Sequence, residues 1–211
     1  MTTVTADDRP AWREARTLAD LGELTAQWLE GRIASQPGYY GPADIEDPAL
    51  IPLLAVLNRA GFVTIASQAG TSGPGFDGAR WQQRAAVEAF TADPGLIQRI
   101  RQGIRDYGLY VVVHDPFTMP RRAAYRGMEL PVTLRDGEEC TWFGRQLSRR
   151  DIRSWRAGWG VCRRSARDAL CNAWQVTVID TEWGRPDVLW RVLERASART
   201  PGGLRVLGRK P

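Results

Sequence analysis

Five consecutive apolar residues, Leu-Tyr-Val-Val-Val at 109–113, form a run as long as any in the chain. Three adjacent valines favour an extended backbone, because β-branched side chains are restricted in a helix and pack well on a pleated sheet. Gly108 precedes the run and His-Asp-Pro follows it, which is typical of the two ends of a strand. The run is far shorter than the roughly 20 residues of a membrane-spanning helix. The run is therefore the strongest strand prediction in the chain, and it predicts no membrane segment.

Several other segments have the periodicity of amphipathic helices. Over 17–31, leucines and Trp28 recur at helical spacing between Thr17, a favourable N-cap, and Gly31, a favourable stop. Further helices are predicted at 48–60, 94–107, 148–160, 161–173 and 185–197.

Short strands are predicted between these helices, at 62–66 and 174–180. The segment 81–90 is ambiguous because its alanines favour a helix, but Asp93-Pro94 directly afterwards begins a new helix, so we favour a strand. The segment 129–143 is predicted to be a hairpin, since Asp136-Gly137 is a strong two-residue turn signal.

Helices and strands alternate irregularly in this pattern, which predicts an α+β fold or a mixed-sheet α/β fold with a central sheet and flanking helices. A length of 211 residues suffices for one buried core. We expect a single domain over 1–197, followed by a flexible tail at 198–211, where glycine, proline and basic residues gather.

The composition is that of an ordinary globular protein, with 43% hydrophobic and 25% charged residues, and it excludes disordered and fibrous classes. The first residues are polar and lack the apolar segment of a signal peptide, so a cytoplasmic protein is expected. Cys140, Cys162 and Cys171 include no C-x-x-C pair, which argues against disulfides and against a zinc site. We expect no bound metal, and no motif identifies a cofactor.

The net charge of +5 is unevenly distributed along the chain. Residues 1–100 contain eight basic and twelve acidic side chains, whereas residues 101–211 contain twenty-one basic and twelve acidic ones. Within the basic half, the segment 142–183 holds five tryptophans with arginines interleaved: Trp142, Trp155, Trp159, Trp174 and Trp183. Stacked aromatic rings and arginines are typical of single-stranded nucleic-acid surfaces, although packing in the core is the simpler explanation of each tryptophan. Nucleic-acid binding is therefore an alternative hypothesis.

A polar, glycine-rich stretch follows the predicted strand at 62–66. Ser67 and Gln68 end the strand, and four glycines follow at positions 70, 73, 75 and 78. Strand ends of α/β proteins often bind ligands, and glycines let the backbone approach a ligand closely. The spacing matches neither established phosphate-binding motif, and a simple surface connection explains the stretch as well.

His114, the only histidine, ends the strand that begins at Leu109. If that strand lay beside the strand that ends at Ser67, then His114 and Asp115 would meet Ser67 and supply a nucleophile, a base and an orienting carboxylate. A triad with Asp180 in place of Asp115 is a further variant, but no G-x-S-x-G turn surrounds Ser67. A histidine bonded to a nearby turn is the simpler alternative.

Two acidic residues, Asp180 and Glu182, follow the predicted strand at 174–180. Such acids can bind a ligand or act as bases, and they can equally cap the next helix. Arg121 and Arg122 are candidates for holding an anionic group of a ligand.

Three segments resemble an uncharacterised actinobacterial protein family: LADLGELTAQWLEGRI, LNRAGFVTIASQAG and WQQRAAVEAF, within residues 10–115. The shared features are a Trp-Leu-x-Gly helix end and a G-F-x-T-x-x-S-Q-x-G segment. The matching residues are Trp28, Gly31, Gly61, Phe62, Thr64, Ser67, Gln68 and Gly70. Ala69 stands where the family pattern has proline. The resemblance implies a shared structural unit and no particular activity.

These observations favour a small-molecule-binding protein, or an enzyme, that acts on a polar or anionic ligand resembling a nucleotide or an amino acid. The predicted catalytic residues are Ser67, His114 and Asp115. The predicted ligand-binding residues are Thr64, Gln68, Gly70, Arg121, Arg122, Asp180 and Glu182. The sequence names no substrate, reaction or oligomeric state.

Overall fold

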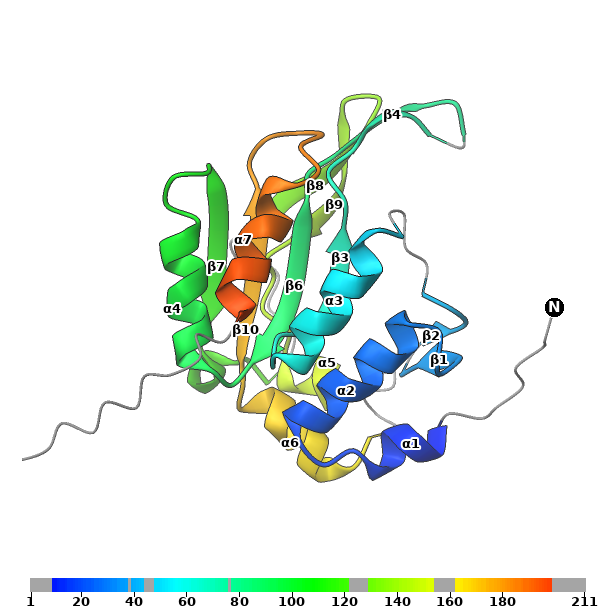
Figure 1. Ribbon diagram of the computed structural model, residues 1–211, viewed down its shortest axis with the longest axis vertical. Coiled ribbons are helices and arrows are strands. Elements are labelled where there is room, and N and C mark those ends of the chain that lie inside the picture. Colours follow the sequence, from blue (N-terminus) through cyan, green and yellow to red (C-terminus); the bar gives the residue numbers. More distant parts are fainter. Residues whose placement is uncertain are drawn as a thin grey trace, which may run out of the picture.

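The computed structural model describes residues 9–37, 39–43, 48–75, 77–121, 129–153 and 162–198. Two four-stranded antiparallel sheets and seven α-helices appear in these residues, so the fold is α+β in a single domain. Figure 1 shows the first sheet with helices in front of it, and the second sheet beyond one end of the first.

The first sheet has the strand order β3-β6-β10-β7. Its strands are β3 (Val63–Gln68), β6 (Ala86–Thr91), β10 (Trp174–Asp180) and β7 (Leu109–His114). The strand predicted from the valine run, β7, therefore lies at one edge of the sheet, and β3 lies at the other.

Four helices cover one face of the first sheet (Figure 1): α2 (Leu18–Leu29), α3 (Leu50–Arg59), α4 (Pro94–Gly103) and α7 (Val188–Ser197). Apolar side chains from alternate positions of the strands, such as Val87 and Ala89 of β6, meet the helices in the largest core cluster. Alternation along a strand sends the intervening side chains to the other face of the sheet.

The second sheet packs near that other face and has the order β4-β5-β8-β9. Its strands are β4 (Ser72–Pro74), β5 (Arg80–Gln83), β8 (Leu130–Arg135) and β9 (Glu138–Phe143). The chain passes between the sheets four times, from β3 to β4, from β5 to β6, from β7 to β8 and from β9 to β10. Ala86 and Ile179 of the first sheet join Val132 and Phe143 of the second in a small core.

Shorter elements close the other end of the first sheet (Figure 1). They are α1 (Arg9–Glu14), β1 (Ser35–Gln36), β2 (Tyr39–Tyr40), the 3₁₀ helix η1 (Pro116–Thr118), α5 (Arg149–Arg153) and α6 (Arg164–Cys171). A second core cluster lies here, in which Trp12 of α1 packs with Ile152 of α5 and Leu170 of α6.

Most predicted elements are confirmed. Thr17 and Asp20 form a capping box on α2, Asp93 caps α4, and Ser148 shares hydrogen bonds with Asp151 at the start of α5. The predicted Asp-Gly turn joins β8 to β9 with positive φ at both Asp136 (52°) and Gly137 (88°), as a type I′ turn requires. Helix α3 begins at Leu50, two residues after the predicted start at position 48.

Two expectations about the sheet are corrected. The sequence predicted one central sheet, and the structure has two large ones. The hairpin β8-β9 pairs with β5 to form the second sheet, and the glycine-rich stretch adds β4 to it instead of forming an open loop. Both large sheets are entirely antiparallel, which rules out the mixed-sheet α/β alternative. Local periodicity predicts strands, but it does not say which strands pair.

No helix in the described ranges is long and apolar enough to span a bilayer. Helix α7 ends at Ser197, close to the predicted domain boundary, and residues 199–211 of the predicted tail lie outside the described part of the chain.

Candidate functional site

The expected meeting of Ser67 with His114 and Asp115 is wrong. Ser67 lies on edge strand β3 and His114 on the opposite edge strand, with β6 and β10 between them. The two strands also run in opposite directions, so that His114 shares a row of the sheet with Val63 at the start of β3. Strand order and direction therefore separate the proposed nucleophile from the proposed base, and Ser67 itself is exposed.

His114 and Asp115 serve different surfaces, because neighbouring strand residues point to opposite faces. The His114 Nε2 atom lies 2.7 Å from the carbonyl oxygen of Gly144, which only accepts, so this nitrogen carries the proton. Asp115 accepts a hydrogen bond of 2.7 Å from the backbone N–H of Phe117 and caps η1. His114 therefore matches the simpler alternative, a histidine at the end of a strand that is hydrogen-bonded to a nearby segment.

Glu88 is a half-buried acidic residue that sequence reasoning missed. Its Oε1 atom accepts hydrogen bonds from the Gly144 N–H at 2.8 Å and from the Thr177 hydroxyl at 3.1 Å. Burial raises the pKa of this carboxyl group. Gln175 binds the same segment through the Leu147 N–H and the Arg145 carbonyl. Together with His114, these side chains attach the segment after β9 to the first sheet.

Most of the segment that carries the family resemblance holds the fold together. The buried Thr64 is bonded through its N–H and hydroxyl to the side chain of Asn58. The Gln68 amide donates to the carbonyls of Arg84 and Val132 at 2.9 and 2.8 Å and accepts from the Thr133 hydroxyl, which joins the two sheets. The polar atoms of both side chains are thus occupied by partners within the protein.

Gly70, Asp180 and Glu182 gather at the same end of the sheet as Gln68. A Cβ atom on Gly70 would lie 2.0 Å from the carbonyl oxygen of Arg185, so only glycine fits. Asp180 is fully buried and accepts two hydrogen bonds from Arg185, at 2.7 and 2.6 Å. Glu182 completes the cluster through an ion pair with the same arginine. The structure therefore brings together four predicted residues, and their contacts serve packing and charge neutralisation.

The tryptophans of the basic half occupy separate places. Trp142 is exposed on β9, Trp174 begins β10, and Trp183 follows the far end of β10, where the guanidinium of Arg84 lies 4.0 Å from its ring centre. Trp155 and Trp159 lie outside the described residues. Trp174 and Trp183 thus lie at opposite ends of β10, so Trp142, Trp174 and Trp183 do not form one stacking surface.

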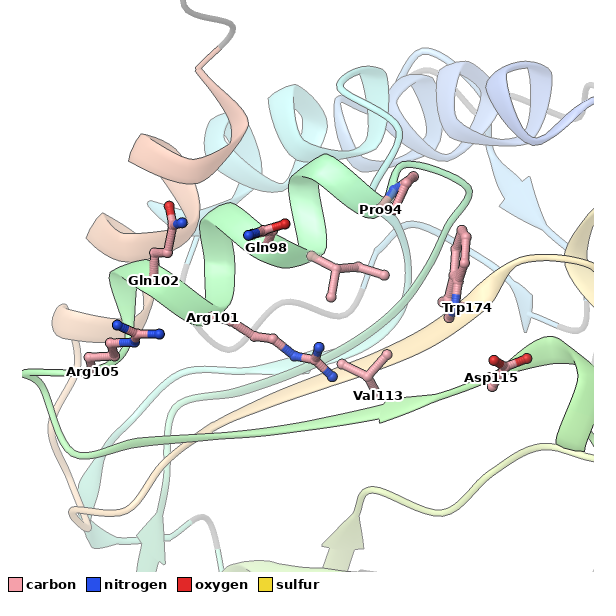
Figure 2. Close-up of a pocket in the computed structure, with 9 residues that line it drawn as sticks. Pro94, Gln98, Arg101, Gln102, Arg105, Val113, Asp115 and Trp174 are labelled. Carbon is pink, nitrogen blue, oxygen red and sulfur yellow. The ribbon is translucent and has the colours of Figure 1, made fainter.

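A groove with a volume of about 640 Å³ lies between α4 and the edge strand β7. Figure 2 shows side chains of α4 and β7 that line it from opposite sides, with Trp174 at one end. Its lining residues are Pro94, Ile97, Gln98, Arg101, Gln102, Arg105, Val113, Asp115 and Trp174. Volumes of roughly 300–1,000 Å³ are usual for ligand sites.

The groove combines an apolar floor with a positively charged wall. Ile97, Val113 and Trp174 supply apolar surface. Arg101 lines the groove from α4, and Arg105 lines it from the turn that follows the helix (Figure 2). Both arginines are exposed, and no carboxylate of the described residues lies within 4 Å of either guanidinium. Asp115 provides a negative charge near the Trp174 end. The arrangement suits an anion attached to an apolar body.

Only one predicted site residue, Asp115, lines this groove. Arg121 is exposed beyond η1, and Arg122 lies outside the described residues. Sequence reasoning missed Arg101 and Arg105 because polar residues opposite the apolar face of a helix normally just face water. The one available signal was that both lie in the segment 94–107, predicted as a helix, which directly precedes the valine-rich strand.

Metal binding and catalysis by the two buried cysteines are the remaining kinds of chemistry to consider. They contain no cluster of three or more histidine, cysteine or acidic side chains that could hold a metal ion. Cys162 and Cys171 are buried and unpaired, and burial raises the pKa of the Cys162 thiol to about 12, which makes it a poor nucleophile at neutral pH.

A comparison with protein families matches residues 7–200 to a domain of unknown function, DUF6919. The chain belongs to the DUF6919 family. The match confirms the predicted membership of an uncharacterised family and extends it from residues 10–115 into the C-terminal half. It therefore includes both walls of the α4–β7 groove. No curated protein matches the chain.

Proposed function

We propose that this DUF6919 protein binds a negatively charged ligand with an apolar body in the groove between α4 and β7. The observation that carries the proposal is the pair Arg101 and Arg105, which lack carboxylate partners among the described residues and border an apolar floor. A structural arginine is usually paired, as Arg185 is with Asp180. Two arginines without carboxylate partners, beside a concave surface, are available to bind the anionic group of a ligand.

The proposal is for binding and not for catalysis. Of the described residues that line the groove, only Asp115 is a common acid–base residue, and none is a serine, cysteine or histidine. The ligand class agrees with the polar or anionic ligand expected from the sequence, but the site lies on the opposite edge of the sheet from Ser67.

A thermal-shift screen tests the proposal. The panel contains mononucleotides, aromatic and aliphatic carboxylates, and short acidic peptides, each measured against the wild type and the Arg101→Gln/Arg105→Gln variant. A ligand of the native state raises the apparent stability. We expect at least one anionic class to raise Tm of the wild type, and the double variant to bind it at least tenfold more weakly because charge-assisted hydrogen bonds are lost.

The matched control is Arg13→Gln/Arg195→Gln, which removes the same charge from two exposed arginines on α1 and α7, outside the groove. This variant should bind like the wild type. An equal loss of binding in both double variants would show a general charge effect, and a panel without any stabilising anion would contradict the proposal.

A further inference from the structure

The edge strand β7 differs from the other edges of the two large sheets. Proteins protect exposed edges with bulges, short strands, prolines or charges, because unpaired backbone groups attract other strands. β3 has a bulge between Thr64 and Ala66, β4 has three residues including Pro74, and β9 begins with Glu138 and Glu139. Each of these three edges therefore carries a recognised protection.

β7 has none of these features. Its six residues, Leu109–His114, include no proline, glycine, acid, lysine or arginine. It pairs with β10 through six consecutive residues without a bulge, and no described strand pairs with its other side. β7 is thus a regular, apolar template for one more strand.

The hydrogen-bond pattern shows which backbone groups are available. The N–H of Thr181 donates to the carbonyl of Gly108 at 3.2 Å, just beyond the paired segment of β10 and β7. Along a strand, the N–H and C=O groups of successive residues point alternately to one side and the other. Since Gly108 points toward β10, the even-numbered residues of β7 do so as well. The odd-numbered residues, Leu109, Val111 and Val113, then direct their N–H and C=O groups toward the open edge.

The groove lies along this edge and α4 forms its outer wall (Figure 2). A strand added to β7 would turn every second side chain toward α4. Those side chains would approach Arg101 and Arg105, so acidic residues at alternate positions are the complementary choice.

We propose that the ligand of the groove is an extended, acidic peptide segment that adds to β7 as a fifth strand of the first sheet. This inference rests on the proposed function and names its ligand class. A second copy of the chain is disfavoured, because pairing of two β7 strands would bring the arginines of two α4 helices together. Backbone hydrogen bonds supply affinity in this mode of recognition, and alternate side chains supply specificity.

Fluorescence anisotropy with a labelled heptapeptide tests the inference on the full chain. The probe alternates glutamate with valine, and the control has the same composition with its glutamates grouped at one end. Two further probes carry N-methyl groups, one on all glutamate amides and one on all valine amides. We expect the alternating peptide to bind, and one methylated form to bind at least tenfold more weakly while the other changes less than threefold, because only alternate amides face β7.

Each other outcome has a definite meaning. If both methylated forms bind like the parent peptide, strand addition is overturned while arginine-dependent anion binding stands. If no peptide binds but a small anion of the screening panel does, the inference fails and the proposed function stands, whereas absence of all binding overturns both. A concentration-dependent dimer that Val111→Pro disrupts would make a second copy the occupant and would also overturn the inference.

Discussion

Glu88 shows what a single half-buried carboxylate contributes to this fold. The Oε1 atom of Glu88 accepts hydrogen bonds from the Gly144 N–H and the Thr177 hydroxyl. Burial raises the pKa of the Glu88 carboxyl group above the ordinary value of 4.5. The unfolded chain releases this proton near 4.5 and the folded protein releases it at higher pH. The contribution of Glu88 to the free energy of unfolding therefore falls as the pH rises from 4.5 through the raised pKa, and stays low above it.

The Glu88→Gln variant keeps an acceptor oxygen without the buried charge. We expect its stability relative to the wild type to increase between pH 5 and pH 8, as measured by urea unfolding at each pH. Glu138→Gln, at an exposed position on β9, is the matched control. If the difference in free energy of unfolding between Glu88→Gln and the wild type is the same at pH 5 and pH 8, the charge on Glu88 does not destabilise the folded protein.

At the scale of elements, the passage of the chain from β3 to β4 depends on a close contact with the segment after β10. A Cβ atom at Gly70 would lie 2.0 Å from the Arg185 carbonyl oxygen and 3.1 Å from the backbone nitrogen of Ala85. Both neighbours are backbone atoms within hydrogen-bonded segments, so neither can move away freely. Gly70 is therefore required for the two sheets to meet as they do.

We expect Gly70→Ala to lower the free energy of unfolding by about 1–3 kcal/mol or more, the usual cost of overpacking. The control is Gly73→Ala on β4, where an added Cβ meets no atom within 4 Å. Chemical denaturation of the two variants measures the difference. Equal stabilities would mean that the segment around Arg185 adjusts without cost.

At the scale of the whole molecule, charge distribution bears on the alternative of nucleic-acid binding. The basic half can attract phosphates, but Trp174 and Trp183 lie at opposite ends of β10 and cannot belong to one stacking surface. We expect a labelled single-stranded oligonucleotide to bind only at low salt, to weaken steeply between 50 and 200 mM salt, and to bind the Trp142→Ala variant equally well. Salt-resistant binding that Trp142→Ala removes would instead favour a stacking surface.

The sequence by itself determined the elements and the class of fold. Thr17 with Asp20, Asp93 before Pro94, and Asp136-Gly137 act through contacts a few residues apart, so their effect can be predicted without tertiary structure. The valine run likewise predicted β7 from its own residues.

Only the tertiary structure decided where functional groups meet. Strand order placed Ser67 and His114 at opposite edges and gave Gln68 partners in the second sheet. It also placed Arg101 of α4 beside the open edge of β7, which no local pattern indicates. The physical reason is that strand pairing and helix docking depend on contacts between residues far apart in the chain, whereas periodicity and capping record only neighbours.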